Sequence, residues 1–299
     1  DFQGTADGSL LLEPASTNLI PYSQNFGATD WFKTRCTIDS GGHTSPSGES
    51  NAFKMTATDD DARLQDGSEA AGVVYTQSIY VKSATGSDVS GQLDFTGTQI
   101  QTFTATSQWQ RVDTTSDGTR AGVVRVRITN SGDELYIWGA QLEALSYPTS
   151  YIPTDGTAVT RVAEVCGGAG NASTFNSAEG VLYVEVAALS DDLSYRILSL
   201  SDGTENERVY MQYTDVSNTI AVVVKEDDVT QANMSYVLSD EVAFSKIAIK
   251  WKVNDFALWV NGSERATDTS GDTPIGLNSL QFDDGNSGNN FYGKTKQLQ

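Results

Sequence analysis

The stretch Val123–Thr129 reads VVRVRIT, and within it apolar and polar side chains alternate from one residue to the next. Successive side chains of a β-strand point to opposite faces of the sheet. The valines and the isoleucine are therefore expected to face a core, while Arg125 and Arg127 are expected on the other surface. This alternation predicts a strand with one buried face.

The same period recurs on both sides of this strand. Val73–Lys82 and Glu134–Leu142 alternate in the first half of the chain, and Gly180–Leu189 and Ser245–Val253 alternate in the second. No stretch sustains the apolar spacing of a helix, and glycine, asparagine, aspartate and serine separate the runs, as β-turns require. The pattern predicts an all-β chain of two β-sandwich (jelly-roll) domains in tandem.

A cluster of prolines and glycines divides the chain near its middle. Pro148 and Pro153 bracket one irregular stretch, and Gly167–Gly170 reads GGAG. The expected organisation is an N-terminal arm over residues 1–17, a first domain over 18–153, a linker over 154–173 and a second domain over 174–299. The arm is expected to pack on the first domain or on a neighbouring subunit. Both ends read as cuts through a longer protein.

Composition narrows the classes of partner. The 299 residues include 39 acidic and 19 basic side chains, which leaves a formal net charge of −20. Phosphate backbones are bound by clustered lysine and arginine, so the balance argues against nucleic acid and against anionic lipid surfaces. No apolar run reaches the roughly 18 residues of a membrane span, and the N-terminal residues do not read as a signal peptide. We therefore expect no membrane insertion.

Two separated stretches carry a family resemblance. Leu10–Phe26 reads LLLEPASTNLIPYSQNF, and Tyr136–Arg161 reads YIWGAQLEALSYPTSYIPTDGTAVTR. Together they resemble the N-terminal and C-terminal sequence motifs of a jelly-roll carbohydrate-binding-like module in bacteriophage tail and structural proteins. The resemblance implies a protein of the virion surface, in a tail fibre or spike, that is made in the cytoplasm of a bacterial host and handles glycans.

The second half carries a weaker resemblance. FNSAEGVLYVEV at Phe175–Val186 and KIAIKWKVNDFALWVNG at Lys246–Gly262 are similar to the opening strand and a hairpin of concanavalin A-like (laminin-G-like) domains. Asn254–Asp255 and Asn261–Gly262 are expected to form tight turns. The resemblance implies a fold that hosts lectins, hydrolases, lyases and adhesion modules, so it does not define the function.

Catalytic constellations are missing from the sequence. The single histidine, His43, lies in a Gly-Gly-His-Thr-Ser stretch that reads as a surface loop, and one histidine with two dispersed cysteines does not make a zinc site. Neither type of glycine-rich phosphate loop occurs. Glycoside hydrolysis needs two suitably spaced carboxylates, but the acidic string of concanavalin A-like hydrolases, Glu-x-Asp-x-x-Glu, is absent. We expect a chain that is not an enzyme.

Two acidic clusters are candidates for structural calcium, which binds oxygen ligands. They are Asp59–Asp61 and Asp283–Asn286, and neither has EF-hand spacing. Solvated acidic turns are the alternative, and the ligands are left unassigned. Cys36 and Cys166 form no motif. A disulfide between them stays open, although thiols of proteins assembled in a bacterial cytoplasm are usually reduced.

Two polar strips are candidate carbohydrate sites, because sugars bind to polar groups converging on one sheet face. In the first domain the alternation places Gln92, Asp94 and Gln141 on the outer surface with the two arginines, and it places Trp138 inward. The first strip consists of Gln92, Asp94, Arg125, Arg127 and Gln141, and the second of Arg208, Tyr210 and Gln212. Replacing both arginines of the first strip with alanine is expected to abolish binding and leave the fold intact. An ordinary solvent face is the alternative for each strip.

Two functions of different classes follow. The first is a non-catalytic glycan-binding module that grips a polysaccharide or cell-surface glycan. The second is a purely structural virion module that contacts other virion subunits, including copies of itself, and binds no sugar. A polysaccharide-degrading fragment is third. Aromatic side chains that line a groove beside polar groups favour the first function, and a large apolar patch between subunits favours the second.

Overall fold

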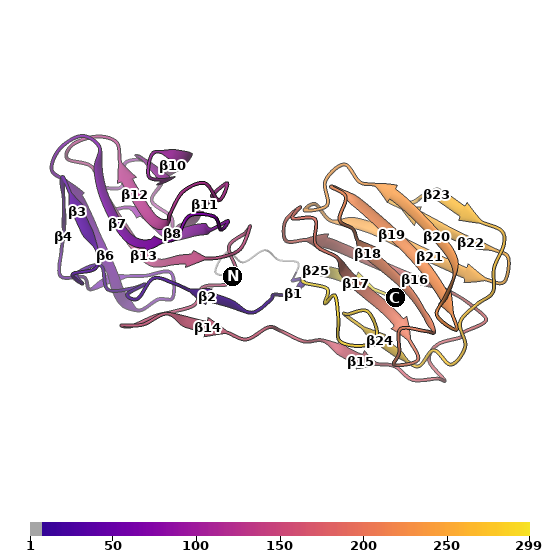
Figure 1. Cartoon of the computed structure of the whole chain (residues 1–299). Helices are drawn as coiled ribbons and strands as arrows, with labels where there is room; N and C mark the ends of the chain where they lie inside the picture. The colour runs from indigo at the N-terminus through magenta and orange to yellow at the C-terminus, as the bar shows by residue number, and fades with distance from the viewer. Residues whose placement is uncertain (1–7) are drawn as a thin grey trace. The chain divides into compact units, whose positions relative to one another are not determined.

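The computed structural model describes residues 8–299, and within them it holds 25 β-strands and no helix (Figure 1). The all-β prediction is confirmed. The described residues form two compact units. Among the described residues, the first unit is Ala15–Val162, and the second combines residues 8–14 with Ala163–Gln299. Each is a β-sandwich, and each is described by itself below.

Two antiparallel sheets build the first unit. The first sheet has the order β10 (Thr98–Ala105), β9 (Val89–Phe95), β12 (Gly122–Ile128), β7 (Ala62–Glu69) and β3 (Phe32–Thr34). The second sheet has the order β11 (Gln110–Thr115), β8 (Thr76–Ser83), β13 (Glu134–Glu143), β6 (Ser50–Ala57) and β4 (Cys36–Ile38), and β5 (His43–Thr44) also pairs with β6. A separate ladder joins β2 (Ser16–Asn18) to β14 (Val159–Arg161).

The second unit also has two antiparallel sheets. The third sheet of the chain has the order β1 (Leu10–Leu12), β25 (Gly293–Leu298), β16 (Glu179–Ala188), β21 (Ser245–Lys252), β22 (Phe256–Val260) and β23 (Ser263–Asp268). The fourth has the order β15 (Gly167–Ala169), β24 (Ser279–Gln281), β17 (Arg196–Ser201), β18 (Arg208–Tyr213), β19 (Thr219–Glu226) and β20 (Val229–Val237).

The predicted arm and linker both contribute strands. Strand β1 lies in the expected arm and pairs with β25, so it belongs to the second unit, whereas the arm was expected to pack on the first domain or on a neighbouring subunit. Leu12, which is 6% exposed, fills that unit's core, and this apolar burial explains the placement. The expected linker holds β14 and β15, and the change of unit falls between Val162 and Ala163. The first seven residues of the predicted arm lie outside the described residues.

Alternation explains the core of the first unit. Val124, Val126 and Ile128 are fully buried, as predicted, and they pack with Leu64 of the same sheet and Ile137 of the facing sheet. Branched and large apolar side chains that meet between two sheets exclude water, which is the main favourable contribution to folding.

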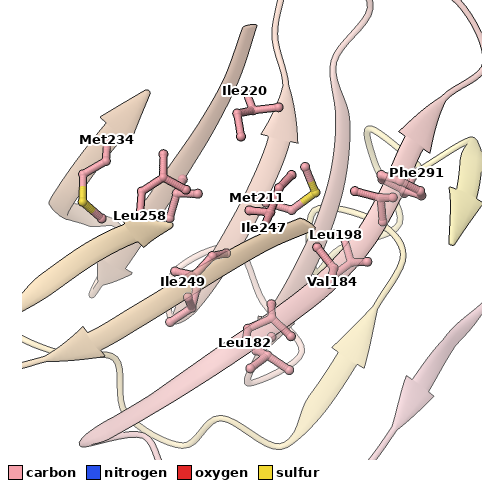
Figure 2. Packing of buried hydrophobic residues seen from close by; sticks show 14 of the residues in the cluster. Leu182, Val184, Leu198, Met211, Ile220, Met234, Ile247, Ile249, Leu258 and Phe291 are labelled. Atoms are coloured by element: carbon pink, nitrogen blue, oxygen red, sulfur yellow. The ribbon is translucent and has the colours of Figure 1, made fainter. Parts of the chain in front are cut away.

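The second core is built in the same way (Figure 2). Val184 and Ile247 of the third sheet face Leu198 and Met211 of the fourth, and all four are fully buried. Phe291 closes the same cluster from the loop before β25. Polar residues alternate with these apolar ones along each strand, so each sheet has one face left for other contacts.

Two predicted turns of the second unit are confirmed. Asn254 has a φ of 56° between β21 and β22, and Asn261 and Gly262 have φ of 51° and 80° between β22 and β23. Such left-handed angles suit asparagine and glycine in tight hairpins. The described residues include no helix long and apolar enough to cross a membrane.

Candidate functional site

Four of the five residues of the first predicted strip do share one face. In the ladder between β12 and β9, Arg127 lies opposite Gln92 and Val126 opposite Leu93. Residues directly opposite each other point to the same side. The polar members of these strands, Asp94 and Arg125 included, therefore lie on the side away from the core. The ladder thus places these four side chains on the face that the alternation predicts.

The charged side chains of this strip nevertheless bind one another. Asp94 is fully buried, and its Oδ1 accepts hydrogen bonds from Arg125 Nη1 at 2.7 Å and from the Gly97 amide at 2.5 Å. Its Oδ2 accepts from Arg127 Nη1 at 3.2 Å, and Arg127 also pairs with Asp61. The solvent-facing position expected for Asp94 was wrong, because the two guanidinium groups cover its carboxylate. This ion-pair network stabilises the sheet and leaves Asp94 little capacity for a ligand.

Gln141 does not join that strip. It lies on β13 of the other sheet and is fully buried. Its Nε2 donates to the Thr149 carbonyl at 3.3 Å, and its Oε1 accepts from the Ile152 amide at 2.7 Å. Gln141 therefore anchors the segment that follows β13, and its prediction as an outward sugar ligand was wrong.

A bulge in β13 explains a second difference. The register of β13 against β8 shifts between Trp138 and Gln141, and Gly139 has a φ of 65°. The extra residue reverses which side chains face the core. Trp138 therefore leaves the main core and packs with Tyr80 and Tyr151, with ring centroids 5.3 and 4.6 Å away. The inward position predicted for Trp138 was wrong for this reason.

The second predicted strip is also engaged internally. Arg208 and Tyr210 share a face of β18, are 5% and 7% exposed, and the guanidinium lies 4.5 Å from the ring centroid. Arg208 Nη1 also donates to the Asp284 carbonyl. The loop after β24 thus covers these two residues, and only Gln212 of the strip is half-buried. This geometry does not leave Arg208 and Tyr210 exposed as a surface for binding a sugar.

Several oxygens of the two acidic clusters are already engaged by protein groups. Asp61 pairs with Arg127. Asp284 Oδ1 accepts the amides of Asn286 and Gly288, and Asp283 Oδ1 accepts the amide of Gly285. Across residues 8–299, no three histidine, cysteine or acidic side chains group around one point that could hold a metal ion. Calcium stays a prediction that a thermal melt with chelator tests, and both cysteines are free thiols.

A different hollow in the first unit gathers polar groups from four separate segments. We call it the amide pocket; its volume is about 360 Å³. It is lined by Gln24, Asn25, Ser40, Gly41, Gly42, Ser50, Asn51, Phe53, Thr154 and Asp155. Sequence alternation could not find it, because the segments are far apart in the chain and only β6 among them is a long strand. The glycine pair Gly41–Gly42 was its one local signal.

Local structure fixes the wall of this pocket. Phe53 is half-buried on β6 and its ring packs edge-on against Phe26, with centroids 5.9 Å apart. Gly41 has a φ of 76°, and a Cβ there would lie 3.1 Å from the Phe53 ring. Only glycine combines this left-handed angle with such close approach, so the loop lies directly against the aromatic ring.

The amides meet beside this ring. Asn51 Nδ2 donates to Gln24 Oε1 at 3.3 Å and to Glu49 Oε2 at 3.3 Å. Asn51 Oδ1 is buried and accepts no hydrogen bond from any described residue. A buried acceptor without a donor is costly. The lining of the pocket therefore includes an asparagine with an unsatisfied acceptor, a second amide and an aromatic ring.

Comparison with known proteins identifies no family. No model of a protein family matches the chain, and no curated protein matches its sequence. Two solved structures are similar over 99% of this chain. Domains LG4-5 of the mouse laminin alpha1 chain are matched at 11% identity over 91% of their length, with a TM-score of 0.31. The tandem CBM22 domain of Xyn10C from Paenibacillus barcinonensis is matched at 8% identity over 98% of its length, with a TM-score of 0.32.

Proposed function

We propose that this chain is a non-catalytic glycan-binding module and that the amide pocket of the first unit is its binding site. One observation carries the proposal: Asn51, whose Oδ1 is buried and accepts no hydrogen bond from the described residues, lines a hollow together with Gln24, Asn25 and Phe53. Sugars present hydroxyl groups around patches of C–H. Planar amides hydrogen-bond the hydroxyls, and an aromatic ring covers the apolar patch.

The charge of the lining selects the kind of sugar. Asp155 is the one ionisable residue among the lining residues, and no basic side chain is among them. A carboxylate can accept hydroxyl hydrogens, whereas an acidic sugar would be repelled by it. A sugar unit without an acidic group is the ligand that fits. Because the hollow is shallow and the ligand is strongly hydrated, we expect affinities of roughly micromolar to millimolar.

The biological setting is proposed from the sequence resemblance. The sequence motifs at Leu10–Phe26 and Tyr136–Arg161 support a phage virion surface protein. The glycan that it binds would then be a polysaccharide of the host cell or its surroundings. Contacts with other virion subunits, homo-oligomerisation and a structural calcium ion are part of this proposal.

One observation favours the structural alternative. On the outer face of the third sheet Trp259 is 40% exposed and Val181 is 58% exposed. Between their strands lies Ala248, whose small side chain is opposite Trp259 in the ladder. Lys250 lies opposite Val181 in the ladder between β16 and β21, but exposed apolar side chains on a sheet face can still contribute to a surface that contacts another protein. A structural virion module would use this face for assembly.

The test begins with a glycan array probed with the full chain, followed by calorimetric titration of the best ligand. Asn51→Ala is expected to weaken binding at least about tenfold, which corresponds to about 1.4 kcal/mol. Gln108→Ala is the matched control, because Gln108 is an exposed amide of the same unit outside the pocket.

Three results would count against the proposal. Absence of any glycan ligand together with a stable oligomer in light scattering would favour the structural module. Equal binding by wild type and Asn51→Ala would place the site elsewhere. Release of reducing ends or unsaturated sugars from a bound polysaccharide would show an enzyme.

A further inference from the structure

A second hollow in the first unit has a different chemistry. We call it the acidic groove; its volume is about 380 Å³. It is lined by Leu19, Pro21, Thr29, Asp30, Phe32, Asp66, Gly67 and Glu69. Three of these residues are acids, and none of them is basic. The groove therefore concentrates the negative charge that the chain carries as a whole.

Asp66 is the unusual member of this set. It follows Leu64 on β7 at the spacing of two that points both side chains inward, and Asp66 is 6% exposed. Its Oδ1 accepts the amide hydrogen of Gly67 at 2.6 Å, and its Oδ2 is buried and has no hydrogen-bond partner among residues 8–299. Placing a carboxylate where only one oxygen is satisfied is costly.

The surroundings of Asp66 make that cost larger. Burial, together with the nearby negative charge of Asp30, raises the pKa of this carboxyl to about 6, although the Gly67 amide acts in the opposite direction. No described cation contacts it, in contrast to Asp94, which two arginines hold. Asp66 Oδ2 therefore lacks a positively charged hydrogen-bond donor.

The rim of the groove adds an aromatic surface. Phe32 on β3 is 69% exposed, although large aromatic side chains are usually buried. Its neighbour Trp31 is buried, and the Trp31 Nε1 donates to the Tyr22 carbonyl at 3.0 Å, which anchors the start of β3. The Phe32 ring is therefore held at the groove on an anchored segment. A cation over an aromatic face is attracted by the ring's quadrupole.

We propose that the acidic groove binds the ammonium group of an amino sugar within the polysaccharide that the chain recognises. This inference rests on the proposed glycan-binding function. An ammonium has three N–H donors and a positive charge, so it can satisfy Asp66 Oδ2 and approach Asp30 or Glu69, while the Phe32 ring covers the sugar's apolar side. Calcium fits less well, because it takes six to eight oxygen ligands and no three acidic side chains of the described chain group to hold it.

The test compares two oligosaccharides that differ only at the nitrogen. The full chain is titrated calorimetrically at neutral pH with a glucosamine hexamer and with an N-acetylglucosamine hexamer. Acetylation removes the charge and two of the donors. We expect the free amine to bind at least about tenfold more tightly, which corresponds to about 1.4 kcal/mol.

Variants assign this preference to the groove. Asp66→Asn should reduce the preference to less than about twofold, a few tenths of a kcal/mol, and Phe32→Ala should weaken binding of the free-amine hexamer. Asp88→Asn is the matched control, because Asp88 is an exposed acid of the same unit that does not line the groove. A thermal melt of Asp66→Asn should show an unchanged or higher midpoint, since a buried charge is removed.

The outcomes separate this inference from the proposed function. Asn51→Ala should weaken both hexamers alike, whereas Asp66→Asn should remove only the difference between them. Equal affinity of the wild type for the two hexamers, binding of neither, or a preference that survives Asp66→Asn overturns the inference. The glycan array then decides the proposed function on its own. Equally tight binding of a lysine peptide would show that the groove recognises ammonium groups without the sugar, which also overturns it.

Discussion

The ion-pair network of the first sheet should contribute strongly to stability, so Arg125→Ala and Arg127→Ala are expected to damage the fold when combined. Asp94 is fully buried, and the side chains of Arg125 and Arg127 are only 11% and 21% exposed. With both guanidinium groups removed, the Asp94 carboxylate keeps the Gly97 amide as its one remaining donor among those described. This reverses the expectation from the sequence that the double variant would keep an intact fold.

The size of the effect follows from this geometry. Removing one arginine takes away a charged hydrogen bond, which costs about 1.5–3 kcal/mol, while the other arginine still neutralises the carboxylate. Removing both leaves a buried charge without a counterion, and such losses cost about 3–5 kcal/mol. Asp94→Asn added to the double variant removes the buried charge. That triple variant should therefore recover part of the loss.

Urea denaturation followed by circular dichroism and calorimetry measures these differences. The first unit's transition should shift and the second unit's transition should stay. Arg120→Ala is the matched control, because Arg120 is exposed and contacts no buried acid, and it should change stability by less than about 0.5 kcal/mol. A double variant within about 1 kcal/mol of wild type, or a triple variant less stable than the double, would refute the reasoning.

Three further predictions concern other elements. Leu12→Ala should destabilise the second unit by about 2–4 kcal/mol and leave the first unchanged in calorimetry, whereas the 43%-exposed Leu10 should tolerate alanine; a shift of the first unit would contradict the placement of β1. Gly139→Ala should cost more than Gly132→Ala in thermal melts, because both have positive φ but only Gly139 faces neighbours; equal losses would contradict this. Burial raises the pKa of Glu241 from 4.5 to about 7, so the second unit should lose stability as pH rises through that range. Glu241→Gln should flatten this dependence, and an unchanged pH profile would contradict it.

Alternation in the sequence predicts the sheet face on which a side chain lies better than it predicts the solvent exposure of that side chain. Alternation placed Val124, Val126 and Ile128 in the core correctly, because side-chain direction follows from the local backbone. The same alternation put Asp94 on the outer face, which is right, and treated it as open to solvent, which is not. Whether an outer face is open depends on long side chains from neighbouring strands, here Arg125, and on the register that brings them together.

Irregular backbone geometry is the second feature that alternation in the sequence does not predict. The single extra residue at Gly139 moves Trp138 from the expected core to a separate aromatic cluster. A glycine within a strand does not by itself indicate whether the strand has a bulge there. The amide pocket was missed for a related reason. Gln24 lies in a loop and Asn51 near the start of β6, and their separation of 27 positions carries no periodic signal.

The two hollows and the two strips differ in how their polar groups are satisfied, and this difference locates recognition in the chain. In the strips the acceptors are used: Asp94 holds two arginines, and Arg208, although its Nε has no partner, contacts the Tyr210 ring and donates to the Asp284 carbonyl. In the hollows one acceptor of Asn51 and one of Asp66 are left without a donor although both are buried. Folding alone gains nothing from such groups, whereas a ligand that brings a hydroxyl or an ammonium gains a hydrogen bond in a partly desolvated place. The strips therefore serve the stability of the sheets, and we expect the ligand where the fold leaves its own acceptors unmet.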